Sequence, residues 1–251
     1  MAARNPSPPP ISEQEADVLY SDNIGDTLFS RKWVLKVLFN ATQQIKSDNE
    51  NINVADSLDS ELCELWDMSM NKDVAIFLQE VDGVDIFLEI ILGSKSSRLT
   101  EISIGIMANM ACQEDICKDI TNREKLIEVM LILMDHRDAP ILVEVTRLVH
   151  VAISKNETRD KWMNAIQHST LLDNLIFILE NSVNEELLLN CSLLLSSLLT
   201  YNKSLVEIVD DEKLRKAVVE AIKQTKNDSG KTRENLLYIQ DLLSEQECTS
   251  S

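Results

Sequence analysis

A helical unit recurs along the middle of the chain. Each copy has a short apolar segment, a polar break and a longer apolar segment, and successive copies lie about 40 to 46 residues apart. The copies cover residues 84–111, 124–154 and 171–200. A repeat of this length is typical of armadillo and HEAT proteins, in which helix pairs bury their apolar faces against neighbouring pairs. The recurrence predicts an α-solenoid, a right-handed superhelix of stacked helix pairs, which presents a long binding surface.

The composition favours helices over strands. The chain has 251 residues, and 44% of them are hydrophobic, which is enough for one substantial core. It has five glycines, five prolines and 4% aromatic residues, whereas a β-sandwich needs many turn residues and aromatic strands. The stretch 141–153 is rich in β-branched residues, but its length and its place in the repeat favour a helix. The sequence therefore predicts an all-α, armadillo/HEAT-like fold.

The charge limits the classes of partner. The formal net charge is −18 and the pI is about 4.5. Nucleic-acid binding depends on neutralising phosphates, and anionic membranes repel an acidic surface, so neither is expected as a partner. An acidic surface attracts a basic protein segment by electrostatic steering. An alternative explanation is that the negative charge only keeps a helical array soluble.

The chain divides into segments of different character. The N-terminus is rich in proline and has no apolar core of a secretion signal. Ser7 precedes Pro8 and is a candidate phosphorylation site, although disorder alone also explains this dipeptide. Ser30 is a candidate N-cap for the first helix, and Ser60 for the first helix of the repeat domain. The expected organisation is a disordered tail (1–17), an N-terminal helix (18–45), an acidic linker (46–60), an armadillo-like repeat domain (61–244) and a disordered tail (245–251).

Few residues are arranged for chemistry. The three histidines show no ligand spacing, and no glycine-rich phosphate loop or nucleophile motif is present, so we expect no catalytic, cofactor-binding or metal-binding residues and no enzyme activity. The five cysteines are odd in number and fit free thiols in a reducing compartment. The most apolar run, 187–199, is shorter than the ~20 residues that cross a bilayer.

Two residues of the repeat domain lead to specific expectations. Trp66 shares an apolar helix face with Leu62, and we expect it to be mostly buried and to close the N-terminal end of the stack. Asn109 interrupts an apolar helix at the place where armadillo repeats carry a groove asparagine that bonds to a bound peptide. The other two copies have Ala152 and Ser197 near that place, so a structural, capping role is the alternative for this candidate partner-binding residue.

Four segments carry a family resemblance: NPSPPP (5–10), IGDTLFSRKW (24–33), ELCELWDMSMNKDVAIFLQE (61–80) and RLTEISIGIMANMACQEDIC (98–117). Together they resemble the serum amyloid A-like proteins, which are armadillo-like, intracellular and associated with synoviocyte proliferation. The resemblance covers the first half of the chain, and beyond residue 154 it is carried by the repeat pattern. The relatives are longer, which implies a shorter member that departs most in the linker and the C-terminal helices.

The resemblance implies a nuclear protein, with the cytoplasm as a second location, that promotes cell proliferation in inflammatory signalling without catalysis. It supplies no binding residues, and the sequence has no strong basic import cluster. The leading hypothesis is a monomeric scaffold that binds protein partners by recognising a basic or extended segment of the partner. One alternative is a structural subunit of an obligate complex that uses its apolar helix faces; another is an enzyme whose site is dispersed in the sequence.

Overall fold

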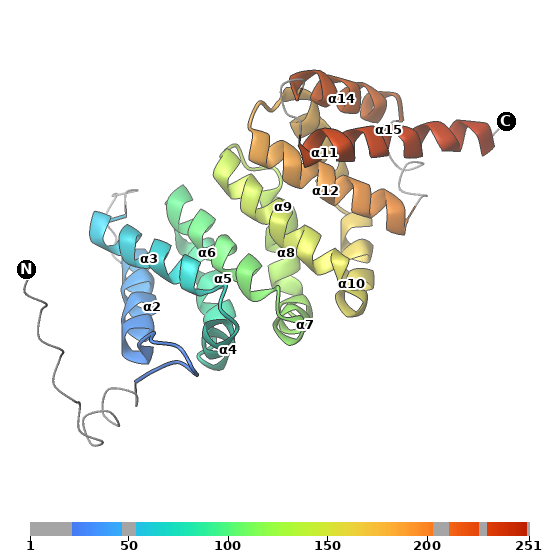
Figure 1. Cartoon of the computed structure of the whole chain (residues 1–251). Helices are drawn as coiled ribbons and strands as arrows, with labels where there is room; N and C mark the ends of the chain where they lie inside the picture. Colours follow the sequence, from blue (N-terminus) through green and yellow to red (C-terminus); the bar gives the residue numbers. More distant parts are fainter. Residues whose placement is uncertain (1–21, 47–53, 203–210, 226–229, 250–251) are drawn as a thin grey trace, which may run out of the picture.

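The chain forms an elongated array of helices (Figure 1). The computed structural model describes residues 22–46, 54–202, 211–225 and 230–249. Within these ranges an isolated bridge between Asn23 and Ser30 is the only β structure, which confirms the all-α prediction. Ser7, the segment 1–17 and much of the expected linker lie outside the described residues.

Each of the three central repeats contains three helices. They are α4 (Lys72–Glu80), α5 (Gly83–Gly93) and α6 (Ser97–Met110); α7 (Glu114–Asn122), α8 (Glu124–Leu133) and α9 (Ala139–Ser154); and α10 (Asn156–Gln167), α11 (Leu171–Asn181) and α12 (Glu185–Tyr201). Two helices precede them, α2 (Arg31–Lys46) and α3 (Asp56–Met68), and two follow, α14 (Asp211–Gln224) and α15 (Lys231–Thr249).

The prediction of two helices for each repeat was therefore incomplete. A short first helix (α4, α7 or α10) precedes the pair in every central repeat. In α10 the apolar residues are few and stand among charged ones, so the periodic signal there is weak. The helix nevertheless forms because it buries Trp162 and Met163 against neighbouring helices.

Five helices stack in one layer. Helix α3 packs on α6, α6 on α9, α9 on α12, and α12 on α15. We call these five helices the ladder layer, and their solvent-facing side the ladder face. Helices α2, α5, α8, α11 and α14 form the opposite layer, where α2 packs on α5 and α11 on α14 (Figure 1). One surface is thus assembled from equivalent helices of successive repeats, as a solenoid requires.

Several helix starts follow local chemistry. The Ser30 hydroxyl accepts a hydrogen bond from the Trp33 amide at 3.1 Å, and Asn184 caps α12 by accepting from the Leu187 amide at 2.9 Å. The Ser30 cap confirms the sequence prediction. Helix α3 begins at Asp56 rather than after Ser60, because Asp56 and Asp59 favour the positive end of the helix dipole.

Trp66 does not close the end of the stack. Its side chain is only partly buried, and the N-terminal end is covered by α2, which packs on α3 and α5. The indole instead lies on the backbone of Gly105 in α6, where a Cβ atom would stand 2.2 Å from ring atoms Cε2 and Cζ2. The expectation about Trp66 was wrong because a single apolar helix face does not show which helix covers it.

Candidate interaction surface

Asn109 lies inside the ladder layer and is 7% exposed. Its amide nitrogen donates to the Trp66 carbonyl oxygen and to the Ser69 hydroxyl, both at 3.0 Å. Its side-chain oxygen accepts from Arg147 Nη1 at 2.7 Å. Of the two roles considered for Asn109, the structural one fits: the amide joins three consecutive ladder helices, α3, α6 and α9. Direct contact with a partner stays a prediction.

Arg147 is the centre of this connection. Its guanidinium donates to Asn109, to the Gly105 carbonyl oxygen at 3.0 Å and to Glu144, with an Nε–Oε2 distance of 2.8 Å. The side chain of Arg147 is 29% exposed. Its planar fork ties α6 to α9 in one geometry.

Glu144 is a buried carboxylate between other carboxylates. Its side chain is 8% exposed. Burial raises the pKa of Glu144, Arg147 opposes the rise, and the nearby charges of Glu186 and Glu101 raise it further. Glu144 therefore lies within electrostatic reach of a carboxylate on each neighbouring ladder helix.

Four carboxylates follow one another across the ladder helices. They are Asp59 of α3, Glu101 of α6, Glu144 of α9 and Glu186 of α12, and we call them the carboxylate stripe. Arg98 joins the first two, with Nε 2.9 Å from Asp59 Oδ1 and Nη1 2.9 Å from Glu101 Oε2. Glu186 is exposed and forms no ion pair within the described residues. The stripe carries more negative charge than its two arginines neutralise.

A cleft of about 800 Å³ opens beside the stripe, at the N-terminal ends of α3, α6 and α9. We call it the acidic cleft. Its charged lining consists of four carboxylates and one guanidinium: Asp56, Asp59, Glu101, Asp138 and Arg98. Because Asp59 and Glu101 belong to both features, cleft and stripe form one continuous acidic surface that favours a cationic ligand.

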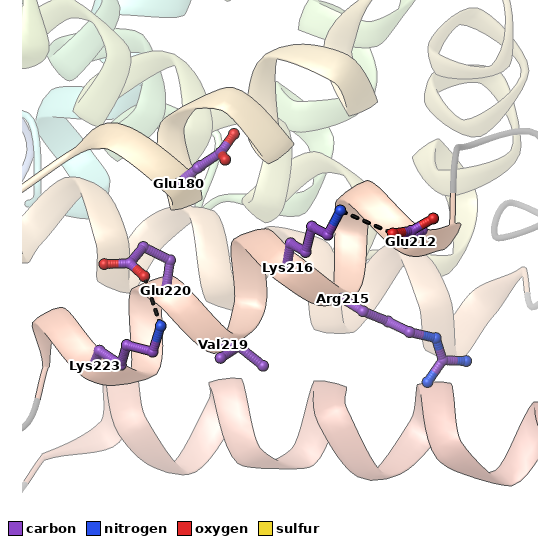
Figure 2. Close-up of a pocket in the computed structure, with 7 residues that line it drawn as sticks. All are labelled: Glu180, Glu212, Arg215, Lys216, Val219, Glu220 and Lys223. Carbon is purple, nitrogen blue, oxygen red and sulfur yellow. Dashed lines mark hydrogen bonds and ion pairs between the residues drawn. The ribbon is translucent and has the colours of Figure 1, made fainter.

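Two other hollows have different chemistry. One, of about 580 Å³, lies along α14 (Figure 2), where Lys216 pairs with Glu212 at 2.8 Å and Lys223 with Glu220 at 3.0 Å. Its three carboxylates and three cations balance, so its charge selects no ligand. The other, of about 480 Å³, lies between the α8–α9 and α11–α12 corners beside the exposed ring of Phe177.

The described residues hold no group of three or more His, Cys, Asp or Glu side chains suited to a metal ion. The four cysteines whose side chains are described (Cys63, Cys112, Cys117 and Cys191) are free thiols. None of the helices described has the length and apolar character needed to cross a bilayer.

The sequence pointed to Asn109 but missed the stripe. Glu144 and Arg147 are recognisable as a helical i,i+3 pair, yet nothing local shows that Glu144 is buried or close to Glu101 and Glu186. The available signal was positional: Glu101, Glu144 and Glu186 all occur in the first half of a long helix, the second helix of each predicted pair.

Solved structures with the same arrangement are armadillo repeat proteins. A designed armadillo repeat protein in complex with the peptide (KR)4 superimposes with a TM-score of 0.56 at 14% identity, covering 85% of this chain and 94% of that one. A computationally designed armadillo repeat protein for modular peptide recognition gives a TM-score of 0.52 at 15% identity, with 83% and 98% covered. The protein is thus an armadillo-like, all-helical repeat protein.

Sequence comparison supplies the family. Residues 171–249 match the family model described as the SAAL1 C-terminal domain. The chain is 34% identical to Protein saal1 of Danio rerio, covering 96% of this chain and 55% of that protein. It is 35% identical to Protein SAAL1 of Mus musculus and 34% identical to that of Homo sapiens, covering 81% of this chain and 46% of each relative.

The chain belongs to the SAAL1 (serum amyloid A-like 1) family, as its N-terminal segments predicted. It spans about half the length of the curated relatives that it matches. The match over residues 171–249 extends the resemblance into the C-terminal helices, where the sequence had indicated the largest departure.

Proposed function

We propose that the protein is a non-catalytic scaffold that binds an extended, basic segment of a protein partner along its ladder face. The observation that carries this proposal is the continuous acidic surface made by the acidic cleft and the carboxylate stripe. An extended segment fits a face built from successive repeats, because each repeat offers an equivalent position to it. The (KR)4 peptide named with one similar armadillo structure is a basic segment of this kind.

The cellular part of the proposal rests on the family. We propose that the protein acts in the nucleus, with the cytoplasm as a second location, and promotes cell proliferation in inflammatory signalling. We further propose that it is a monomer and that neither nucleic acid nor a membrane is its partner, because a net charge of −18 repels both kinds of anionic surface. Fractionation of cells expressing the tagged chain tests the location. If the chain were recovered only in fractions outside the nucleus, the proposed location would be contradicted.

Charge reversal on the two layers tests the scaffold proposal. Glu186→Lys alters the ladder face, whereas Glu89→Lys alters an exposed glutamate of α5 in the opposite layer by the same charge. Proximity labelling in cells should recover partners with the wild type and with Glu89→Lys but lose them with Glu186→Lys. Equal loss with both variants, or no loss with either, would refute binding on the ladder face.

A second function, as a structural subunit of an obligate complex, is favoured by exposed apolar side chains in the layer opposite the ladder. Phe39, Ile132 and Phe177 are 62%, 69% and 65% exposed. An obligate interface buries such side chains. The two functions differ in light scattering of the purified chain: a scaffold runs as a monomer, whereas an obligate subunit aggregates when it is expressed alone.

A further inference from the structure

We infer that the carboxylate stripe contains a recognition site for a single cationic side chain, Lys or Arg, of the partner, with Glu144 at its floor and Glu101 and Glu186 at its rim. This inference rests on the proposed function and deepens it, because it places one partner residue between α6, α9 and α12. Three independent features of the described residues support it.

The first feature is a carboxylate oxygen without a donor, on a buried side chain. Both hydrogen bonds that Arg147 gives to Glu144 end on Oε2. No other described residue donates to Glu144, so Oε1 accepts no hydrogen bond while the side chain is 8% exposed. Buried polar atoms are normally paired, since an unpaired one loses hydration without compensation. A donor arriving from the ladder face would pair this oxygen.

The second feature is repulsion among the carboxylates. The charges of Glu186 and Glu101 both act against ionisation of Glu144. Arg98 is shared between Asp59 and Glu101, and Arg147 is bound to Glu144, so no described cation is paired with Glu186. A ligand cation relieves this repulsion, and its binding energy includes that relief.

The third feature is room beside the stripe. The acidic cleft of about 800 Å³ is lined by Asp59 and Glu101 but not by Glu144 or Glu186, so it can receive the backbone and stem of a peptide residue next to Glu101. Accessibility increases from floor to rim: the side chains of Glu144 and Glu101 are 8% and 17% exposed, and Glu186 is exposed. A ligand therefore meets Glu186 first, and the buried carboxylate of Glu144 adds electrostatic attraction.

A fluorescent (KR)4 peptide is a suitable probe for the purified chain of 251 residues. Fluorescence anisotropy at low salt should show binding that Glu186→Gln and Glu101→Gln each weaken by about three- to tenfold. Glu89→Gln removes the same charge from an exposed site on α5 and should change the affinity by less than about twofold. Glu186→Asp keeps the charge and should retain most of the affinity.

The outcomes are distinct for correctly folded variants, which circular dichroism identifies. Equal weakening by Glu186→Gln and Glu89→Gln would mean that only the overall charge attracts the peptide, and it would overturn the inference. If (KR)4 does not bind while partners are still lost with Glu186→Lys in cells, the inference fails and the proposed function survives. If the peptide does not bind and no partner depends on the ladder face, both fail.

Discussion

At the scale of single residues, polar side chains hold the ladder helices in register. Asn109, Arg147 and Glu144 form one hydrogen-bonded set. The bonds of Asn109 join neighbouring helices, and the bond between Arg147 and Glu144 spans one turn of α9. These groups are buried or half-buried, so each depends on its partners to offset lost hydration. Three changes test whether these contacts are structural, electrostatic or steric in origin.

Replacing Asn109 by Ala should destabilise the chain. The change removes the donor to the Trp66 carbonyl and the acceptor for Arg147, and we expect a loss of about 1–3 kcal/mol in the free energy of unfolding. Urea denaturation measures it. Asn190→Ala, which removes one bond of 3.2 Å to the Val143 carbonyl from a half-buried site, is the milder control. Unchanged stability with a lost partner would instead make Asn109 a direct contact.

Glu144→Gln should reveal the cost of the buried charge. Because the pKa of Glu144 in the folded chain is raised above its ordinary value of 4.5, ionisation destabilises the fold at neutral pH, and this penalty vanishes as pH falls toward 4.5. Gln carries no such penalty. The unfolding free energy of Glu144→Gln minus that of the wild type should therefore rise from about pH 4.5 to about pH 7.5.

The matched control for this pH series is Glu89→Gln, which removes the same carboxylate from an exposed position. A difference for Glu144→Gln that is constant or falls with rising pH would show that burial does not disfavour the Glu144 charge.

Gly105→Ala should disturb the contact between α3 and α6. The added Cβ would stand 2.2 Å from the Trp66 ring, so the indole or the helix must move, at a cost of about 1–3 kcal/mol. Gly93→Ala is the comparison, since its Cβ would meet the single Ile45 side chain, at 2.5 Å from Cγ2, rather than a packed indole ring. Thermal denaturation compares them; an equal melting temperature for Gly105→Ala and the wild type would contradict the packing of Trp66 on Gly105.

At the scale of elements, the prediction succeeded where a helix has a strong apolar pattern of its own. Helix α9 formed despite its β-branched residues, as its place in the repeat indicated. Helix α10 was missed because its helical state depends on tertiary contacts: Trp162 is fully buried and its Nε1 donates to Thr121 of α7 at 3.0 Å. Residues 41 positions apart supply that bond, and local periodicity carries no information about it.

Trp162→Phe tests the connection between α7 and α10. The smaller ring leaves a void and removes the donor to Thr121, so we expect a loss of about 1–3 kcal/mol in stability. Trp33→Phe, at a partly buried position, is the matched control and should cost less. Denaturant titration measures both, and a larger loss for Trp33→Phe would contradict the importance of α10 to the core.

At the scale of the whole molecule, the repeat period and the net charge were enough to predict an acidic solenoid. They could not predict where acidic side chains would cluster on the surface, since the carboxylate stripe depends on the register between α6, α9 and α12. The same register buries Asn109, which the sequence suggested would face a partner. Fold class thus follows from local patterns, whereas the interaction surface follows from how the repeats stack.

Hydrogen–deuterium exchange with and without saturating (KR)4 peptide tests the central claim, that the ladder face binds a basic extended segment. Amides protected from exchange by the peptide should concentrate in the first two turns of α6, α9 and α12, beside Glu101, Glu144 and Glu186. Helices α5, α8 and α11 in the opposite layer should exchange as they do in the free chain. Protection confined to that opposite layer, or spread evenly over both layers, would contradict the claim.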